Sequence, residues 1–322
     1  MRRMSDADLP AEFALIARHF GPLAGPGALG LGDDAACLAP PPGRELVLTV
    51  DAMIGGVHFL PDDPPDLVGR KLLRVNLSDL AAKGAEPIGY LLTVAAPRDT
   101  PDAWFAAFAA GLAQDQAEFG ATLLGGDTTS IPGPIALSLT AIGHVAAGTM
   151  VHRAGARPGD GIWVTGTIGD GALGLAVAQG RLTDPTGFLL RRYRLPQPRV
   201  GFAVAGIASA GMDISDGLVQ DLGHICRAGS VSAEIDAALV PLSEPARKAG
   251  AGWLTSILSG GDDYELLLAV PPAHEPALRE AARGAGVAVT HIGRFRRGPP
   301  RVAVRGPGGQ PMALARGGWS HF

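Results

Sequence analysis

The sequence predicts an α/β fold with two domains. Short apolar runs alternate with stretches whose apolar residues recur at helical spacing, and this alternation is typical of α/β proteins. The chain has 322 residues, 47% of them hydrophobic and 18% charged, which is enough apolar material for the cores of two domains. A stretch rich in glycine and proline at 148–160 indicates a linker. We therefore expect domains at 1–148 and 149–322.

The first half is expected to alternate strands and helices. Apolar runs predict strands at 46–51, 88–95 and 135–145. A helix should begin at Pro64-Pro65-Asp66 and end at Gly84. A second should run from Pro101 to about Gly120, because proline is favoured in the first turn of a helix and glycine after the last.

The second half repeats the alternation. Strands are expected at 162–165, 212–214, 264–270 and 287–292. Helices are expected at 170–179, after Pro198, from Ser215 to about Ala228 and at 275–285. Ser215 is a suitable N-cap for the third of these helices. The stretch 298–318 is rich in glycine and proline, which predicts irregular structure.

The composition argues against several classes of protein. The net charge is −4 and the pI about 6.1, and no basic stripe of the kind that binds nucleic acid is present. Cys37 and Cys226 lack metal-site spacing, and we expect both to be buried, as suits a reducing cytosol. Residues 1–20 have no continuous apolar core, and no run of about 18 apolar residues occurs, so we expect neither a signal peptide nor a membrane span. The predicted location is the cytoplasm.

Carboxylates recur beside glycines, at the ends of apolar runs or on one helical face. They lie in Gly32-Asp33-Asp34, at Asp51 and Asp79, in Gly126-Asp127 and in Asp213-x-x-Asp216. Mg²⁺ prefers hard oxygen ligands and is usually held by one or two carboxylates together with substrate phosphates. The pattern therefore predicts a chain that gathers several Mg²⁺ ions around a polyphosphate.

Each of these segments also has a structural explanation. Asn76, Asp79 and Lys83 share one helical face, which is typical of a solvated surface, although asparagine is a weak helix former in mid-helix. The segment 125–129 (GGDTT) is compatible with an ordinary turn, and 213–217 (DISDG) with a helix cap. His58 follows two glycines and is compatible with either a structural or a ligand-binding role.

Any nucleotide has to bind without a Walker A loop, because no lysine is followed by serine or threonine. Gly169-x-Gly171-x-x-Gly174 matches the dinucleotide fingerprint, but no clear second strand ends in an acid about 20 residues on. We interpret these glycines as close-packing positions whose backbone N–H groups face an anion. Asp262, Asp263 and Glu265 form a further acidic turn, with more acids than solubility requires.

Taken together, these segments resemble the thiamine-monophosphate kinase family, from Glu12 nearly to the C-terminus. The matching stretches are GLGDDAA (30–36), TVDAMIGGVHF (49–59), VNLSDLAAKGAEP (75–87), GGDTT (125–129), HRAGARPGD (152–160), VTGTIGDGALGL (164–175), RYRLPQPRV (192–200), MDISDGLVQDLGHI (212–225), SGGDDYELL (259–267) and GWSHF (318–322). Each stretch is moderately specific, and their common order is very specific. The wider superfamily includes aminoimidazole ribonucleotide synthetase and selenophosphate synthetase.

The resemblance implies a two-domain fold of the aminoimidazole ribonucleotide synthetase type. It implies a homodimer in which the N-terminal sheets of two subunits join into a barrel. The implied reaction transfers the γ-phosphoryl group of ATP to thiamine monophosphate, assisted by several Mg²⁺ ions, and makes thiamine diphosphate. Because the acceptor is itself a phosphate, we expect direct in-line transfer without a covalent protein nucleophile.

The resemblance also implies roles for individual residues. Those that match the family's metal-binding positions are Asp34, Thr49, Asp51, Asp79, Asp127, Asp213 and Asp216. Those that match its ATP-contacting positions are Gly126, Asp127, Arg153 and Ser215. Those that match its substrate-contacting positions are His58, Asp262 and Trp319. The family usually has glutamate at the position of Asp262 and often a hydroxyl residue at the position of Val50.

Two other functions remain as alternatives. The first is another enzyme of the superfamily, such as the ATP-dependent aminoimidazole ribonucleotide synthetase, against which His58, 262–265 and Trp319 argue. A selenophosphate synthetase is disfavoured because no cysteine lies in residues 1–30. The second alternative is a non-catalytic nucleotide-sensing scaffold, which could keep the glycine-rich loops without needing the acids.

Overall fold

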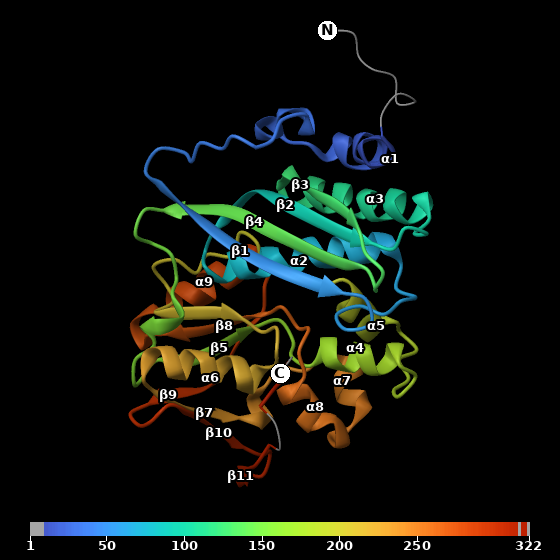
Figure 1. Ribbon diagram of the computed structural model, residues 1–322. Coiled ribbons are helices and arrows are strands. Elements are labelled where there is room, and N and C mark those ends of the chain that lie inside the picture. The colour runs from blue at the N-terminus through green and yellow to red at the C-terminus, as the bar shows by residue number, and fades with distance from the viewer. Residues whose placement is uncertain (1–9, 315–316, 321–322) are drawn as a thin grey trace. The chain divides into compact units, whose positions relative to one another are not determined.

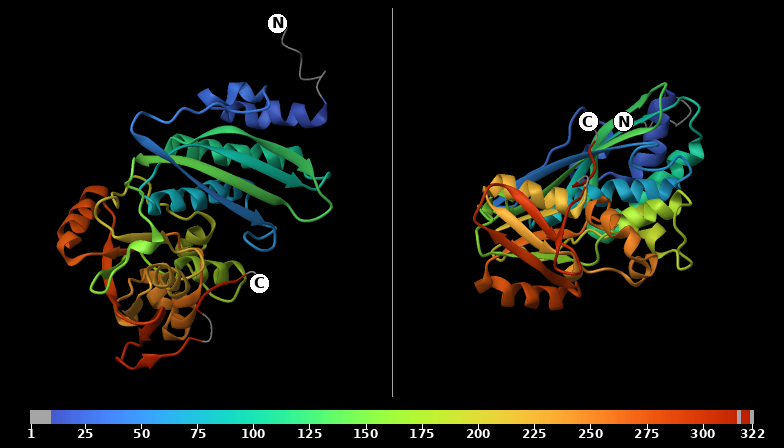
Figure 2. Two further views of the ribbon diagram at one scale, coloured as in Figure 1. Left: turned by 60° about the vertical axis from the view of Figure 1, so that its left-hand side comes forward. Right: turned by 90° about the horizontal axis from the view of Figure 1, so that it is seen from below.

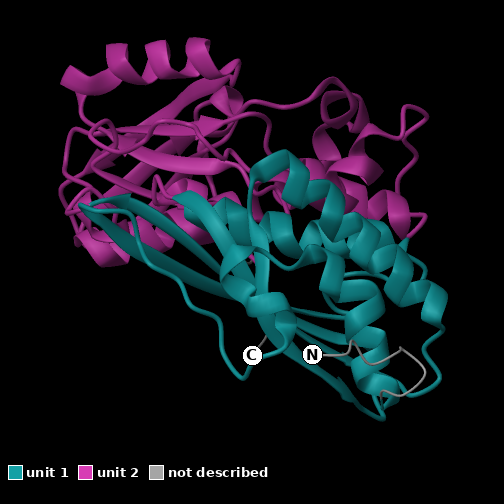
Figure 3. Cartoon of the chain, turned by 90° about the horizontal axis from the view of Figure 1, so that it is seen from above, with its two compact units in different colours: residues 1–80, 86–146 teal, residues 81–85, 147–322 magenta. Residues whose placement is uncertain are grey.

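The computed structural model describes residues 10–314 and 317–320 (Figure 1). The chain divides into two compact units, residues 1–80 with 86–146 and residues 81–85 with 147–322 (Figure 3). Both units combine a β-sheet with helices, which confirms the predicted α/β class. The domain boundary after residue 148 stays a prediction.

Unit 1 contains a four-stranded sheet with the order β1-β4-β2-β3. Its strands are β1 (Arg44–Ile54), β2 (Glu86–Ala96), β3 (Thr122–Ser130) and β4 (Ala136–Ala146). Its helices are α1 (Ala11–Leu15), α2 (Pro65–Ala82), whose last residues belong to unit 2, and α3 (Asp102–Phe119). Strand β4 runs antiparallel to β1 and β2, whereas β2 and β3 are parallel. As predicted, α3 ends at Gly120, which adopts the left-handed conformation with φ 74°.

Helices α2 and α3 cover one face of this sheet. Gly69 and Gly111 let the two helices approach closely, because an added Cβ would lie 2.5 Å from the Phe108 carbonyl oxygen and 2.0 Å from that of Asp66. The other face, which we call the outward face, carries large exposed apolar side chains. These are Leu46, Leu48, Val50 and Leu91.

Residues in a single row of the sheet reach both of its edges. Asp51 of β1 pairs with Leu139 of β4, and Leu139 pairs with Leu92 of β2. Leu92 in turn pairs with Gly126 of β3. Neighbouring strands are spaced by about 4.8 Å, so Asp51 and Gly126 stand about 14 Å apart at opposite edges.

Unit 2 contains a seven-stranded sheet with the order β11-β10-β7-β9-β5-β8-β6. Its strands are β5 (Gly161–Thr165), β6 (Ala210–Asp213), β7 (Ser232–Asp236), β8 (Leu266–Val270), β9 (Val289–Arg296), β10 (Arg301–Arg305) and β11 (Pro311–Met312). Its helices are α4 (Asp170–Ala178), α5 (Phe188–Arg194), α6 (Leu218–Gly229), α7 (Glu244–Ala249), α8 (Leu254–Ser259) and α9 (Glu275–Ala285).

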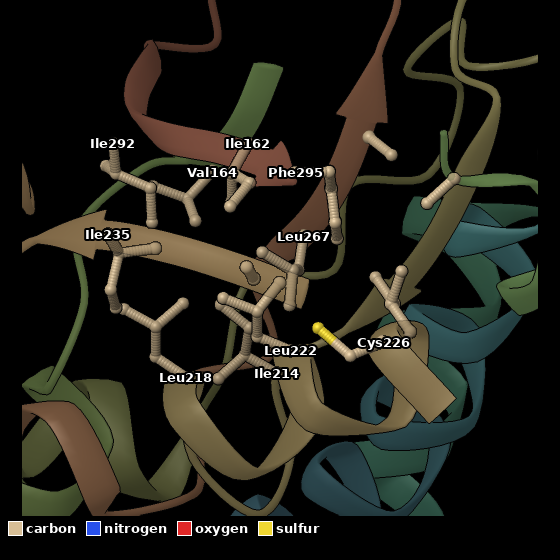
Figure 4. Packing of buried hydrophobic residues seen from close by; sticks show 14 of the residues in the cluster. Ile162, Val164, Ile214, Leu218, Leu222, Cys226, Ile235, Leu267, Ile292 and Phe295 are labelled. Atoms are coloured by element: carbon tan, nitrogen blue, oxygen red, sulfur yellow. The ribbon is translucent and has the colours of Figure 1, made fainter. Parts of the chain in front are cut away.

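The sheet of unit 2 has a helix on each face (Figure 2). On one face, α6 packs Leu218, Leu222 and Cys226 into a core that includes Ile235 and Phe295 (Figure 4). On the other face, α9 packs against a second cluster of buried side chains. Its members include Trp163, Leu266, Leu268, Val270, Leu278 and Ala282. The alternation of β5 and β8 residues between these cores explains why both strands read as continuous apolar runs.

Several expectations about this unit are wrong. No helix follows Pro198; turns and irregular chain occupy residues 195–209, and α5 lies before them instead. In the stretch 298–314, β10 and β11 form where irregular structure was expected; residues 315 and 316 of the predicted irregular stretch lie outside the described residues. The short elements β7, α7 and α8 were not expected. Cys226 of this unit is buried as predicted, whereas Cys37 of unit 1 is exposed, against expectation.

Within residues 10–314 and 317–320, no helix combines the length and apolar character needed to cross a membrane.

Candidate active site

Unit 1 carries a first group of acids at the β1 edge of its sheet. The Thr49 hydroxyl donates a hydrogen bond to the Asp79 carboxylate at 2.5 Å. The Asp51 N–H donates to the side-chain oxygen of Asn76 at 3.1 Å, and the Asn76 amide donates to the Leu72 carbonyl at 2.9 Å. We call Asp51, Asp79 and Thr49 the β1 acid group.

Asn76 explains how this group is held together. Its side chain is fully buried, so the solvated-surface explanation for its helical face is wrong at this position. Asn76 ties the backbone of β1 to that of α2, and thereby fixes Asp51 relative to Asp79. A weak helix former is kept in mid-helix because its amide has two backbone partners to satisfy.

A second group of acids lies in unit 1 near the β3 edge. Asp34 and Asp127 are both exposed and line one cleft of about 810 Å³ between residues 12–38 and the outward face of the sheet. The Asp34 N–H donates a hydrogen bond to the Asp33 carboxylate at 2.8 Å. Gly126, beside Asp127, has to be glycine for β3 to pair closely with β2, because a Cβ there would lie 1.8 Å from the Leu92 carbonyl oxygen. We call Asp34 and Asp127 the β3 acid group.

One copy of unit 1 does not bring these two groups together. They lie at opposite edges of the sheet, and Asp127 shares the outward face with its partner Thr93, whereas Asp51 faces α2. Oxygen ligands of Mg²⁺ lie about 2.1 Å from the ion. Asp127 directly follows Gly126, which lies three strand spacings or about 14 Å from Asp51, so Asp51 and Asp127 cannot share an ion. Val50 is 60% exposed on the outward face, away from the β1 acid group.

His58 lies in the turn that follows β1. Its Nδ1 accepts the Ile54 N–H at 3.0 Å, which places the proton of the neutral ring on Nε2. The nearly buried ammonium of Lys71 donates to the His58 carbonyl at 3.1 Å. Gly56 allows the turn with φ 79°. The backbone around His58 is therefore fixed from two sides.

In unit 2, three predicted residues follow one another at the end of β6. Asp213 is almost fully buried, and Ser215 and Asp216 lie in the turn before α6. The Asp221 carboxylate accepts the N–H groups of Ser215, Asp216 and Gly217 at 3.0, 3.0 and 3.1 Å. The cap of α6 is therefore Asp221 and not Ser215, which leaves the Ser215 hydroxyl outside the capping role.

Charge and burial shape this turn. Burial, and then the neighbouring charge of Asp216, raise the pKa of Asp221 to about 7. Ligand atoms of Asp216, Asp221 and His224 lie within 4.8 Å of one another, a spacing that suits a cation. Burial, followed by the charges of Arg227 and Arg153, lowers the pKa of His224. Arg153, which is exposed in a single turn of helix (Arg153–Gly155), thus acts electrostatically on this group.

Residues far apart in the sequence meet at the same turn. The Trp319 N–H donates to the Asp216 carbonyl at 3.0 Å, and the Asp262 N–H donates to the Ser215 carbonyl at 2.9 Å. Gln220 donates to the Asp216 carboxylate at 3.2 Å and also to the Trp319 carbonyl. The Trp319 side chain is 55% exposed. The structure therefore joins Ser215 and Asp216 to both predicted substrate residues of unit 2.

The glycine-rich loop before α4 binds an acidic side chain of the chain itself. The Gly169 and Gly171 N–H groups donate to the buried Asp263 carboxylate at 2.7 and 3.1 Å. Complete burial raises the pKa of Asp263 well above its ordinary value. The expected close packing is confirmed at Gly174, where a Cβ would lie 2.1 Å from the Leu189 carbonyl oxygen.

A second buried carboxylate lies beside the loop. Glu265, almost fully buried, accepts hydrogen bonds from Arg192 at 3.0 Å, Arg199 at 2.7 Å and Thr165 at 2.7 Å. Sequence reasoning assigned no role to Asp221, Arg192 or Arg199. The only signal was their place in the matching stretches 192–200 and 212–225.

Comparisons with known proteins identify the family to which the chain is related. Residues 32–145 match the family model described as AIR synthase related protein, N-terminal domain, and residues 157–304 match the corresponding C-terminal domain. The thiamine-monophosphate kinase of Caulobacter vibrioides is 46% identical, over 97% of this chain and 91% of the relative.

Solved structures show the same similarity. The crystal structure of thiamine-monophosphate kinase from Stenotrophomonas maltophilia superimposes with a TM-score of 0.82 at 37% identity, covering 94% of this chain and 98% of that one. The structure of AaThiL complexed with AMPPCP and TMP gives 0.76 at 30% identity, covering 100% and 99%. With the two domain models matched along the chain and this identity over nearly its full length, the chain belongs to the thiamine-monophosphate kinase family.

Proposed function

We propose that the chain transfers the γ-phosphoryl group of ATP to thiamine monophosphate and releases thiamine diphosphate and ADP. The observation that carries this proposal is the turn at Ser215 and Asp216. The backbone N–H groups of Asp262 and Trp319 both donate hydrogen bonds to carbonyls of this turn. A candidate ATP contact, a candidate metal ligand and two candidate substrate contacts thus share one site. The family membership and the AaThiL complex with AMPPCP and TMP support the same reaction.

The proposed ligands suit Mg²⁺. They are the carboxylates of Asp34, Asp51, Asp79, Asp127, Asp213 and Asp216, with the hydroxyl of Thr49. All are hard oxygen donors, and Asp34 and Asp127 are exposed. Bound Mg²⁺ would neutralise charge on the phosphates of both substrates.

The chain itself positions the reactants. Arg153 presents a guanidinium for the ATP phosphates. Ser215 presents a hydroxyl, and Gly126 is exposed beside Asp127. His58, Asp262 and Trp319 orient thiamine monophosphate. The proton on His58 Nε2, fixed by the Ile54 contact at Nδ1, makes that nitrogen a donor for the acceptor phosphate.

The transfer is proposed to be direct. An oxygen of the acceptor phosphate forms the new bond to the γ-phosphorus while the bond to the β–γ bridging oxygen breaks, and ADP leaves with that electron pair. A phosphate oxygen is already nucleophilic near neutral pH, so no general base is needed. Trapping a labelled phospho-protein that forms and decays at the rate of turnover would contradict this mechanism.

A homodimer is proposed to complete the metal site. The β1 and β3 acid groups lie too far apart in one copy of unit 1 to share an ion, while Leu48, Val50 and Leu91 expose apolar surface on the outward face. A second copy that covers this surface would bring the β3 acid group of one protomer to the β1 acid group of the other. The pairing is isologous, so both sites form together.

The decisive experiment supplies ATP, Mg²⁺ and thiamine monophosphate to the purified chain. Thiamine diphosphate and ADP should appear in equal amounts, and omission of Mg²⁺ should abolish both. The absence of product, together with turnover of a ring-closing purine precursor, would favour the aminoimidazole ribonucleotide synthetase alternative. Tight ATP binding without any turnover would favour the scaffold alternative.

A further inference from the structure

The turn that carries Asp262 has an unusual backbone. Asp262 has φ 70° and Tyr264 has φ 51°, in the left-handed region that side-chain-bearing residues rarely adopt. Two such residues separated by one position are costly, and the cost is greater for a bulky residue such as tyrosine. Strained backbone of this kind persists only where the surroundings hold it in place, and it concentrates at functional sites.

Asp263, between these two residues, anchors the turn. The buried Asp263 carboxylate is bound by the Gly169 and Gly171 N–H groups, and Arg192 donates to the Asp263 carbonyl at 3.1 Å. On either side, the Asp262 and Tyr264 N–H groups donate to the carbonyls of Ser215 and Ile214 at 2.9 and 2.8 Å. The turn is therefore anchored along its whole length, and its two strained residues cannot relax independently.

The anchored turn directs the Tyr264 hydroxyl to the Asp262 carboxylate. The hydroxyl donates to Asp262 Oδ1 at 3.2 Å, and both side chains are partly exposed. A hydrogen bond to one carboxylate oxygen restricts rotation of the group and so fixes the direction of the other oxygen. Asp262 is one methylene shorter than the glutamate usual in this family, so its placement depends on such support.

We propose that Tyr264 is a positioning residue that orients the Asp262 carboxylate toward the organic part of the phosphate-bearing substrate. That part of thiamine monophosphate carries a cationic ring and an amino group, and a fixed carboxylate oxygen can accept a hydrogen bond from the amino group. The inference rests on the proposed function. It assigns Tyr264 to recognition of the acceptor, and not to ATP binding or to phosphoryl transfer.

The test compares Tyr264→Phe with the wild-type chain. Removal of the hydroxyl should raise KM for thiamine monophosphate by about three- to ten-fold, the usual effect of one lost hydrogen bond. The KM for ATP, kcat and the melting temperature should stay unchanged. The matched control is Tyr90→Phe, which removes a hydroxyl bonded to Gln116 in unit 1; it should leave KM for thiamine monophosphate unchanged.

A double-mutant cycle with Asp262→Ala, which removes the acceptor of the Tyr264 hydrogen bond, separates positioning from a general effect on packing. If Tyr264 acts through the carboxylate, Tyr264→Phe should change KM little once Asp262 is already substituted. Additive effects of the two changes, or an unchanged KM in Tyr264→Phe, would overturn the inference while wild-type turnover remained. A wild-type chain that makes no thiamine diphosphate would refute the proposed function instead, which keeps the two failures distinguishable.

Discussion

The hydroxyl of Thr49 donates a hydrogen bond to the carboxylate of Asp79 at 2.5 Å and so joins strand β1 to helix α2. Asn76 makes a second connection between the same two elements through the Asp51 N–H. The β1 acid group is therefore held in place by protein contacts alone, and carboxylates preorganised in this way bind a cation with little further ordering.

Substitution of Asp79 tests the metal assignment. Asp79→Asn removes the negative charge but keeps an oxygen that can accept the Thr49 hydrogen bond, so the fold should survive. We expect kcat/KM for thiamine monophosphate to fall by at least about a hundred-fold, corresponding to roughly 3 kcal/mol of transition-state stabilisation. Thermal unfolding followed by circular dichroism should show an unchanged melting temperature.

The matched control for that change is Asp99→Asn, at an exposed acid in the loop between β2 and α3. It should leave both turnover and melting temperature unchanged. Near-normal activity in Asp79→Asn would contradict the assignment of Asp79 as a metal ligand.

Asp263→Asn should destabilise unit 2. The buried carboxylate accepts two backbone N–H groups, and an asparagine amide would turn a donor toward one of them. An unsatisfied buried donor costs about 1–3 kcal/mol of unfolding free energy, which urea denaturation measures directly. Asp184 provides the comparison, because its carboxylate also accepts backbone N–H groups, from Thr186 and Leu189 at 2.9 and 2.7 Å, but in a more exposed loop. Equal losses for Asp184→Asn and Asp263→Asn would show that burial is not the cause.

Asp170 should give the chain a pH-dependent stability. Burial raises the pKa of Asp170 above its ordinary value of 3.8, although the hydroxyls of Ser243 and Thr167 partly oppose the shift. The folded state thus keeps this proton to a higher pH than the unfolded chain. The resulting contribution to the free energy of unfolding is greatest in acid and declines as pH rises from about 4 through the folded-state pKa.

Asp170→Asn removes that titration and isolates its effect. Urea denaturation from pH 4 to pH 8 should show the stability of the wild-type chain, relative to the variant, decreasing with pH and then levelling off. A relative stability that rises with pH would contradict the direction of the pKa shift.

Subunit mixing tests the proposed sharing of acids between protomers. Asp51→Asn and Asp127→Asn chains should each be nearly inactive alone. After random exchange at equal amounts, half of the dimers contain one of each chain, and each of these has one intact site, so about a quarter of wild-type activity should return. Mixing two separate preparations of Asp51→Asn serves as the control. No recovery, with exchange verified by differently tagged chains, would place both groups in one protomer's site.

The sequence predicted best where the deciding interactions are local. Helix α9 begins and ends at the expected residues, 275 and 285, because its apolar spacing, first-turn proline and terminal glycine lie within one stretch. Strand β6 ends at Asp213, one residue before its predicted end at 214. Strand β1 was predicted to end at Asp51, but it continues to Ile54, so Asp51 lies inside the strand.

Prediction failed where the hydrogen-bond partner of a backbone group, or the order of the strands, cannot be inferred from the local pattern. Ser215 was expected to cap α6, but Asp221 accepts the three N–H groups from inside the helix. The N–H groups of Gly169 and Gly171, which were expected to face an anion, donate to the side chain of Asp263, more than ninety positions away in the chain. The division of the acids into β1 and β3 groups follows from the strand order β1-β4-β2-β3, which no local pattern encodes.

The distance between Asp51 and Gly126 across the sheet has a consequence for the monomeric chain. Such a chain presents its acids as two incomplete sets at opposite edges of the sheet. If the proposed dimer completes each metal site, nucleotide bound to the lone chain is not activated, and water cannot take the place of the proper acceptor. Dimerisation then protects against futile ATP hydrolysis, because burial of the apolar outward face and completion of the metal site occur in the same step.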